Sequence, residues 1–366
     1  MSAAGSGTIT SALRLTQSAC EVLAPLVRKI YLRIDDSTRM EKKDSSLFSL
    51  ADGLVQHAFF EWFFRQQVAH LVGEESAAVN LETPPFSVGK LEIPSDLMPD
   101  IQSAKSRILS LSGQLAALPS LSAAADSVFL DPIDGTREFC TGLGHQSTIC
   151  VGFAREGAVL GGVVFRPIPE PPTWAVGCRQ EGFFQASLAP AQEGPSGKQG
   201  LLTTNGSVSP FLATLMQELG YQRVPSGGAG NKMLMLLEGH GSLYLQDRGL
   251  SRWDTCAAQA VLEAQQGFLK KLSPFVADGS LQDYTYRQTP SNLDLIPGQA
   301  RITPYNRASK DSAPGTPIDS PSQVLPYSNL AGLLAVSAAH SSPAALLHLS
   351  ESIRKVIQAG HLPSYD

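Results

Sequence analysis

Apolar side chains recur at helical spacing through the first part of the chain. Leu13, Leu23, Val27 and Ile30 lie on one face of residues 10–33, which predicts an amphipathic helix there. The same period predicts two more helices, one that starts near residue 49 and one over residues 100–117. A polar, charged segment separates the first two helices, so we expect a turn between them.

The pattern between residues 71 and 184 is that of β-strands. Short apolar runs bounded by polar residues predict strands over residues 71–72, 127–130, 148–153, 159–165, 173–176 and 182–184. The turn residues 155–158 join the third and fourth runs, so these two strands are predicted to form a hairpin.

The second half of the chain alternates strands and helices, as α/β domains do. The predicted elements are a strand over 201–203, a helix over 210–219, a glycine turn at 227–230, a helix that ends at 238, a strand over 241–245 and helices over 254–266 and 342–358. A flexible stretch at 190–200 predicts an N-terminal α+β domain of residues 1–189 and a C-terminal α/β domain of residues 190–366. Residues 275–325, rich in proline, serine and aspartate, are predicted to be an irregular insertion.

The composition is that of a globular protein. The 366 residues suffice for roughly two domains, and 43% hydrophobic with 17% charged residues excludes a disordered chain. A net charge of −5 excludes the basic footprint of a protein that binds nucleic acid or an anionic membrane. The longest apolar stretch, residues 158–165, is too short to cross a membrane.

The cysteines indicate a reducing compartment. They are Cys20, Cys140, Cys150, Cys178 and Cys256, an odd and scattered set without a Cys-x-x-Cys pair. This argues against a disulfide framework and against a zinc ribbon. The first ten residues lack the basic and apolar regions of a signal peptide. We therefore expect a soluble, cytoplasmic protein.

Carboxylates occur in four segments that could hold a metal. They are Asp52 near a helix start, Glu74-Glu75 after a strand, Asp131-Pro132-Ile133-Asp134-Gly135-Thr136 after another strand, and Trp253-Asp254 at a helix start. Mg²⁺ prefers several oxygen ligands in octahedral geometry. Taken singly, three of these segments have simpler interpretations: the glutamates as a solvated turn, and Asp52 and Trp253-Asp254 as helix caps or dipole partners.

The third segment is harder to explain by packing alone. Asp131 is predicted to end a strand, and Pro132 to turn the backbone. The Ile133 carbonyl and the Asp134 carboxylate can then face the same cation. The glycine and threonine that follow are predicted to begin a helix whose free N–H groups point at an anion.

Three of these motifs, taken in order, resemble one family. Gly73-Glu74-Glu75-Ser76, the segment of residues 131–136 and Trp253-Asp254-Thr255-Cys256-Ala257 together resemble the inositol monophosphatase superfamily of Mg²⁺-dependent, lithium-sensitive phosphomonoesterases. The resemblance covers about residues 45–270. It implies an α+β/α/β fold, the layered α-β-α-β-α sandwich of inositol monophosphatase and fructose-1,6-bisphosphatase.

The spacing of the motifs is similar to that of one branch of this superfamily. Asp131 follows Glu74 by 57 positions, a longer gap than in simple inositol monophosphatases and one that resembles the inositol polyphosphate 1-phosphatases. The 3′(2′),5′-bisphosphate nucleotidases are the nearest alternative. Two features depart from the polyphosphatase pattern: Gly135 stands where the polyphosphatases carry serine, and residues 263–266 lack the double glycine usually seen after this helix. A non-catalytic inositol phosphate sensor is a further alternative.

The resemblance implies a role for each residue of the motifs. The metal ligands, for two or three Mg²⁺ ions, would be Glu74, Glu75, Asp131, the Ile133 carbonyl, Asp134 and Asp254. Thr136 and Asp52, with Glu74, would activate the attacking water, because a threonine alone is a poor base. The substrate phosphate would lie beside Asp134 on the N–H groups of Gly135 and Thr136. Li⁺ would act as an inhibitor.

The second half of the chain is predicted to contact the substrate. The candidate residues there are Asn205, Ser207, Gly228, Ala229 and Lys232. A glycine turn that feeds a helix, with a lysine in its first turn, can bind a second phosphate, although a solvated turn is the simpler alternative. We therefore expect removal of the 1-phosphate from inositol 1,4-bisphosphate or 1,3,4-trisphosphate by a monomer or homodimer that has no nucleic-acid or membrane partner.

Overall fold

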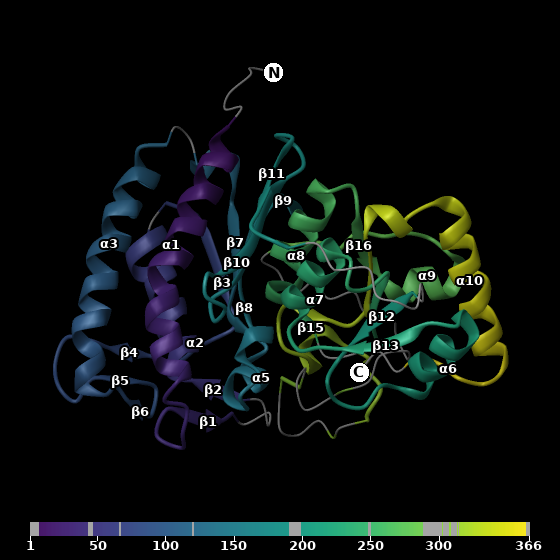
Figure 1. Cartoon of the computed structure of the whole chain (residues 1–366), viewed down its shortest axis with the longest axis horizontal. Coiled ribbons are helices and arrows are strands. Elements are labelled where there is room, and N and C mark those ends of the chain that lie inside the picture. Colours follow the sequence, from purple (N-terminus) through teal and green to yellow (C-terminus); the bar gives the residue numbers. More distant parts are fainter. Residues whose placement is uncertain are drawn as a thin grey trace.

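Two β-sheets, separated and flanked by helices, form the computed structural model of this chain (Figure 1). The structure describes residues 7–42, 47–65, 67–118, 121–189, 199–247, 250–287, 302, 307–308, 313 and 315–363. Of the predicted insertion at 275–325, residues 288–301, 303–306, 309–312 and 314 lie outside the described residues.

The first sheet contains six strands from the N-terminal half. In spatial order they are β11 (Phe183–Ala186), β10 (Thr173–Cys178), β9 (Ala158–Arg166), β8 (Thr148–Arg155), β7 (Ser127–Asp134) and β3 (His70–Gly73). Neighbouring strands are antiparallel except β3 and β7, which are parallel. Every residue of β7 is buried, because helices cover both faces of the sheet. Burial on both faces explains why the strand begins with a continuous apolar run and not with alternating apolar and polar residues. The predicted hairpin of β8 and β9 is confirmed.

The second sheet contains five shorter strands. They are β13 (Gln222–Pro225), β12 (Gly200–Thr203), β14 (Leu243–Gln246), β18 (Leu333–Val336) and β16 (Phe268–Lys271). Three smaller sheets pair β1 (Arg39–Glu41) with β2 (Leu47–Ser49), β15 (Leu250–Ser251) with β17 (Ser328–Asn329), and β4 (Val79–Asn80) with β5 (Ser87–Val88) and β6 (Leu91–Glu92). The sequence pattern predicted β12 and β14 but not β13, β16 and β18.

The helices predicted from sequence are present with ends shifted by a few residues. They are α1 (Thr8–Tyr31), α2 (Leu50–His57), α3 (Met98–Ala116), α5 (Thr136–Cys140), α6 (Pro210–Leu219), α7 (Ala229–Glu238), α8 (Arg252–Ala264) and α10 (Pro343–Gln358). Two short helices, α4 (Leu121–Ala124) and α9 (Leu272–Asp278), were not predicted, and α9 overlaps the start of residues 275–325, which were expected to be irregular. The π-helix η1 (Ala58–Phe64) continues α2, and single 3₁₀ turns are η2 (Ser95–Leu97), η3 (Gly144–Gln146), η5 (Pro321–Gln323) and η6 (Ala338–His340).

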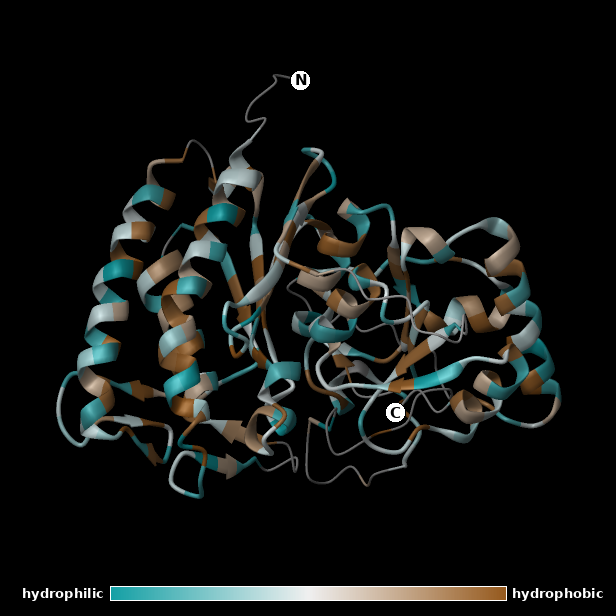
Figure 2. Ribbon diagram, in the orientation of Figure 1, coloured by the Kyte–Doolittle hydropathy of each residue, from teal (hydrophilic) through white to brown (hydrophobic). Residues whose placement is uncertain are grey.

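These elements stack in five layers (Figure 1). Helices α1 and α2 cover one face of the first sheet, and α3 packs against α1 and η1. Helices α7 and α8 lie between the sheets, and α6, α9 and α10 cover the far side of the second. Helices carry hydrophilic and hydrophobic residues together in Figure 2, as expected where one face packs on a sheet. The predicted α-β-α-β-α sandwich is confirmed.

Helix α8 lies unusually close to the first sheet because glycines face it. A Cβ atom at Gly162 would lie 2.6 Å from the Cα atom of Ala257, and one at Gly152 would lie 2.6 Å from the Ala257 nitrogen. A side chain at either position would push the helix outward. Since Asp254 lies in the first turn of α8, this close packing also determines how far that carboxylate reaches toward β7.

Two further expectations from composition concern the cysteines and the membrane. All five cysteines are buried free thiols. Among the described residues, no helix is both long enough and apolar enough to cross a membrane. The two-domain division stays a prediction, and residues 190–198 at its boundary lie outside the described part of the chain.

Candidate active site

Three aspartates from two distant segments meet at the end of β7. Asp131 and Asp134 belong to β7, Asp254 belongs to α8, and one oxygen from each lies within 4.8 Å of the other two. Burial, followed by the charges of Glu74 and the two other aspartates, raises the pKa of Asp131 well above its usual value. Burial and Asp134 raise the pKa of Asp254 to about 7. Like charges this close oppose ionisation unless a cation balances them.

Asp134 is held by groups from both halves of the chain. Its Oδ1 accepts a hydrogen bond from the Ala229 amide at 2.9 Å, and its Oδ2 accepts from the Gly230 amide at 2.7 Å and from the Thr148 hydroxyl at 2.8 Å. The two amides are free N–H groups at the start of α7. Burial nevertheless raises the pKa of Asp134, although Lys232 and these hydrogen bonds oppose the rise.

The two remaining motif aspartates occupy the same position in their helices. Asp254 accepts a hydrogen bond from the Ser251 amide at 2.6 Å, and Asp52 accepts from the Ser49 amide at 2.9 Å. Ser49 and Ser251 are the N-caps of α2 and α8, and the aspartates are the third residues of capping boxes. The interpretation of Trp253-Asp254 as an N-cap is therefore wrong, because the N-cap of α8 is Ser251, three residues before Asp254. In both helices the capping contact fixes the carboxylate toward the site.

Thr136 and Asp52 form the hydroxyl–carboxylate pair that the motifs implied. The Thr136 hydroxyl lies 3.0 Å from Asp52 Oδ1 and 2.9 Å from the Ile133 carbonyl oxygen, and it can donate to either. Asp52 is completely buried. Burial raises its pKa to about 6, although Lys42 opposes the rise. A carboxylate with this pKa is mostly ionised at neutral pH and can accept a proton there.

The turn between β7 and α5 carries the backbone groups predicted to receive phosphate. Strand β7 continues to Asp134, with an irregular register between Asp131 and Asp134, so the expectation that Asp131 ends the strand is wrong. Gly135 then has a φ of 84° and is the N-cap of α5. Gly228 passes so close that a Cβ atom there would lie 2.7 Å from the Gln146 carbonyl oxygen. Both glycines are required by this geometry.

A lysine that the sequence pattern did not single out lies at the predicted glutamate ligands. Lys42 Nζ lies 3.1 Å from Glu74 Oε1 and 2.5 Å from Glu75 Oε1. Burial alone would lower the pKa of Lys42, but Glu74, Glu75 and Asp52 raise it above its usual value. Burial and Glu74 raise the pKa of Glu75 to about 8. The lysine neutralises negative charge at the position where the motifs place a cation. In the sequence, only its place in a polar, charged turn could have indicated a role for this lysine.

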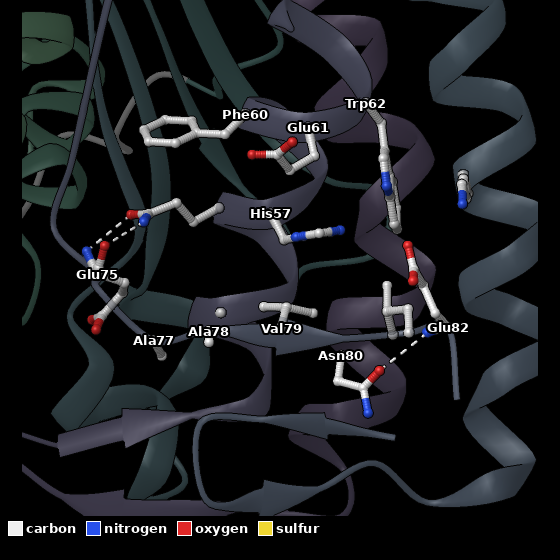
Figure 3. Close-up of a pocket in the computed structure, with 14 residues that line it drawn as sticks. His57, Phe60, Glu61, Trp62, Glu75, Ala77, Ala78, Val79, Asn80 and Glu82 are labelled. Carbon is white, nitrogen blue, oxygen red and sulfur yellow. Dashed lines mark hydrogen bonds between the residues drawn. The ribbon is translucent and has the colours of Figure 1, made fainter. Parts of the chain in front are cut away.

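Gln56 fixes the backbone of the glutamate pair. Its side-chain amide accepts from the Glu75 nitrogen at 2.9 Å and donates to the Glu75 carbonyl at 2.5 Å, shown by the dashed lines beside Glu75 in Figure 3. Gln56 and Glu75 also line a cavity of about 690 Å³ between α2, η1, α3 and β4. Within it His57 points toward Trp62, with ring centres 5.2 Å apart (Figure 3). The three clustered aspartates do not line this cavity, so it lies beside the aspartate cluster and adjoins the candidate site at Glu75.

The predicted substrate contacts of the second half are placed differently from expectation. Lys232 is 3% exposed and donates to the Ser226 carbonyl at 3.2 Å, and burial lowers its pKa to about 8. The Ala229 amide donates to Asp134, and contact of Ala229 and Lys232 with a substrate phosphate stays a prediction. The helix start is turned toward a carboxylate of the protein itself.

The polar loop at 204–207 lies near α5. Asn205 Nδ2 donates to Glu138 Oε1 at 2.9 Å and to Gln146 Oε1 at 2.8 Å. Ser207 is exposed in the same loop. Gln146 Oε1 also accepts from the Gly227 amide at 2.7 Å, which joins this loop to the turn before α7. Asn205 and Ser207 as ring contacts therefore stay a prediction.

The residues present are suited to a divalent cation. Among the described residues, Asp131 Oδ1 is buried without a hydrogen-bond partner, which is costly for a carboxylate oxygen unless a cation contacts it. The surrounding donors are carboxylate oxygens, which hard cations such as Mg²⁺ prefer. Glu74 acts electrostatically on Asp131 and Asp254, so it lies near the same cluster.

Magnesium is expected to change how stability depends on pH. Without metal, the pKa of Asp254 rises from 3.8 to about 7 on folding, so its contribution to stability is complete below 3.8 and is lost as the pH rises through 7. Mg²⁺ binds the ionised carboxylates, so its stabilising effect should be small near about pH 6 and larger near about pH 8. Thermal melts in EDTA and in Mg²⁺ measure this. An increase in Tm on adding Mg²⁺ that is the same at both pH values would contradict it.

Comparison with known proteins agrees with this geometry. The inositol monophosphatase family matches residues 8–274. The mouse 3′(2′),5′-bisphosphate nucleotidase 1 is 33% identical over 149 residues, which are 39% of this chain and 48% of that protein. The human Golgi-resident adenosine 3′,5′-bisphosphate 3′-phosphatase is 27% identical over 191 residues, 50% of this chain and 48% of that protein. The matched region thus spans about half the length of these relatives.

Solved structures show the same fold. The extragenic suppressor protein suhB from Bartonella henselae has a TM-score of 0.53 at 13% identity and covers 94% of this chain and 98% of its own. A structure described as an IMPase/NADP phosphatase with NADP and Ca²⁺ has a TM-score of 0.51 at 13% identity, with 94% of both chains covered. With the motifs, the fold and the match over residues 8–274 in agreement, the chain belongs to the inositol monophosphatase family.

Proposed function

We propose that this protein is a Mg²⁺-dependent phosphomonoester hydrolase. The observation that carries the proposal is the meeting of Asp131, Asp134 and Asp254 within 4.8 Å, beside the Thr136–Asp52 pair. A decayed, non-catalytic sensor would have no need to keep both a cation site and a proton acceptor. Phosphate release from a small phosphate ester, dependent on Mg²⁺ and abolished by EDTA, tests this function.

The cation site would be formed by the residues that the motifs named. They are Glu74, Glu75, Asp131, the Ile133 carbonyl, Asp134 and Asp254. When bound, Mg²⁺ would lower the pKa of a coordinated water and neutralise charge on the phosphate. Lys42 now balances Glu74 and Glu75, so this amine would have to move away from any cation held there.

The proton of the attacking water would pass to groups of this chain. The Thr136 hydroxyl donates to Asp52 Oδ1, which leaves the threonine oxygen free to accept from a water in the site. Asp52 is ionised at neutral pH and is held by Ser49, so it keeps the threonine in that orientation. The amides of Gly135 and Thr136 would orient the phosphate.

We propose a small molecule with two or more phosphates as the substrate. Motif spacing supports inositol 1,4-bisphosphate or 1,3,4-trisphosphate with loss of the 1-phosphate. The names of the mouse and human relatives support adenosine 3′,5′-bisphosphate as a second candidate. Because Lys232 is buried in this structure, we propose an additional, exposed cation for the second phosphate. Arg137 is exposed in the first turn of α5, next to Thr136, and is the residue we propose.

Arg137→Ala is expected to raise KM for the preferred bisphosphate by about tenfold, because a charge-assisted hydrogen bond is worth about 1.5 kcal/mol or more. KM for the matched monophosphate should change little. The panel is inositol 1-phosphate, inositol 1,4-bisphosphate, adenosine 5′-phosphate and adenosine 3′,5′-bisphosphate at fixed Mg²⁺. Arg155→Ala, at the exposed far end of β8, is the control. Equal effects on monophosphates and bisphosphates would exclude this role for Arg137.

Lithium is expected to inhibit turnover at millimolar concentration. Lys42 and Glu74, whose side chains are each 22% exposed, indicate a cation position that is only partly buried, and a small monovalent ion could replace Mg²⁺ there and delay phosphate release. Initial rates in LiCl, compared with KCl of equal ionic strength at limiting Mg²⁺, measure the effect. Identical rates in the two salts would contradict it. A cytoplasmic location and a monomeric or dimeric state stay predictions of the sequence.

A further inference from the structure

Arg166 makes an extensive set of buried contacts away from the acidic cluster. It is the last residue of β9 and is 7% exposed. Its Nη1 and Nη2 atoms donate to the two oxygens of Glu238 at 2.7 and 2.9 Å. Its Nε donates to Asn231 Oδ1 at 2.6 Å, and Nη1 reaches the Thr173 hydroxyl at 3.3 Å. One guanidinium therefore joins both sheet strands β9 and β10 to helix α7.

The two partners on α7 lie at opposite ends of that helix. Glu238 is its last residue, and Asn231 lies in its first turn. A planar guanidinium with donors on two edges can hold both at once, whereas a lysine amine cannot reproduce this geometry. The contacts therefore determine both the rotation of α7 about its axis and its position along the sheet.

The first turn of α7 is also the part of the helix that serves the candidate site. Ala229 and Gly230 donate their amides to Asp134. Asn231 Nδ2 donates to the Ser226 hydroxyl at 2.8 Å and to the Gly227 carbonyl at 3.2 Å, which fixes the turn before the helix. A small rotation of α7 would break the contacts to Asp134, because two adjacent amides must both point at one carboxylate.

We infer that Arg166 is a positioning residue for the cation site, acting on Asp134 through Asn231 and helix α7. The inference rests on the proposed function only in assigning Asp134 to a cation. We infer that the buried Arg166–Glu238 ion pair determines Mg²⁺ affinity as well as the stability of the fold. Groups that orient metal ligands from behind commonly affect affinity tenfold or more.

The test compares two kinds of destabilised protein. Arg166→Lys and Glu238→Gln disturb the contacts to α7, and Glu238→Gln keeps the size and one acceptor of the side chain. Glu181→Ala is the matched control, because Glu181 accepts from the Ile9 and Thr10 amides at the start of α1, far from α7 in the layer order. All three variants should lower Tm in EDTA.

Mg²⁺ affinity separates a positioning role from a structural one. Each protein is titrated with MgCl₂, and binding is measured by calorimetry and by the rise in Tm. The affinity should be at least about tenfold weaker in Arg166→Lys and Glu238→Gln and unchanged in Glu181→Ala. Mg²⁺ affinity within twofold of wild type in both Arg166→Lys and Glu238→Gln would overturn the inference. The titration needs no substrate, so it stands even if the protein hydrolyses none of the esters tested. Wild-type protein that binds no Mg²⁺ would instead overturn the proposed function and the inference together.

Discussion

Asp254→Asn is expected to lower kcat/KM by about a thousandfold or more at millimolar Mg²⁺, because a cation in such a site contributes several kcal/mol to the transition state. An amide cannot supply the charge that holds a divalent ion against water. The fold should survive, because the asparagine oxygen can still accept from the Ser251 amide in the capping box.

Asp254→Asn is also expected to change how the melting temperature depends on Mg²⁺. The pKa of Asp254 is raised by burial and by Asp134, so removing its charge relieves repulsion when no metal is present. In EDTA the variant should therefore melt at the wild-type temperature or above it, and Mg²⁺ should no longer raise Tm. Asp100→Asn is the control, since Asp100 lies in the first turn of α3 and pairs with Lys29 away from the site. Near wild-type turnover in Asp254→Asn would refute the assignment of this residue to the cation.

Thr136→Val and Asp52→Asn are expected to lower kcat by about 10²- to 10⁴-fold, the usual contribution of a positioned proton acceptor. Valine has the shape of threonine but cannot donate to Asp52 or accept from water. Asparagine at 52 keeps an acceptor for the Ser49 amide, so α2 should retain its capping contact. The Mg²⁺-induced rise in Tm should stay near wild type in both variants, because neither residue belongs to the clustered aspartates.

Ser342→Ala provides the control for these hydroxyl deletions. Ser342 is the N-cap of α10 and accepts from the Ala345 amide at 3.3 Å. Its removal should lower Tm and leave kcat unchanged. If Thr136→Val keeps wild-type kcat, the hydroxyl–carboxylate pair is a structural contact and another group accepts the proton.

Much of the candidate site could be predicted because each aspartate has an informative local context. Asp131 and Asp134 follow an apolar run that reads as a buried strand, and Asp52 and Asp254 begin amphipathic helices. These contexts depend on side chains within four residues, which sequence periodicity reports directly. The layered fold could be inferred for the same reason, since the long helices and the β8–β9 hairpin have clear patterns. Strands β13, β16 and β18 were not predicted, although the equally short β12 and β14 were. In β13 and β16 two of the four residues are polar or charged, so no apolar run marks these strands.

The sequence by itself determined which residues carry charge at the ends of strands and helices. Only the tertiary structure decided which group each charge contacts. Asp134 accepts hydrogen bonds from amides 95 and 96 positions away, and Lys42 pairs with glutamates 32 and 33 positions away. For Lys232 only the tertiary structure shows that the packing of α7 buries its amine beneath the turn that precedes the helix. A hydrogen bond requires two atoms within about 3 Å, and that distance is set by how the layers pack, which no local pattern of residues records.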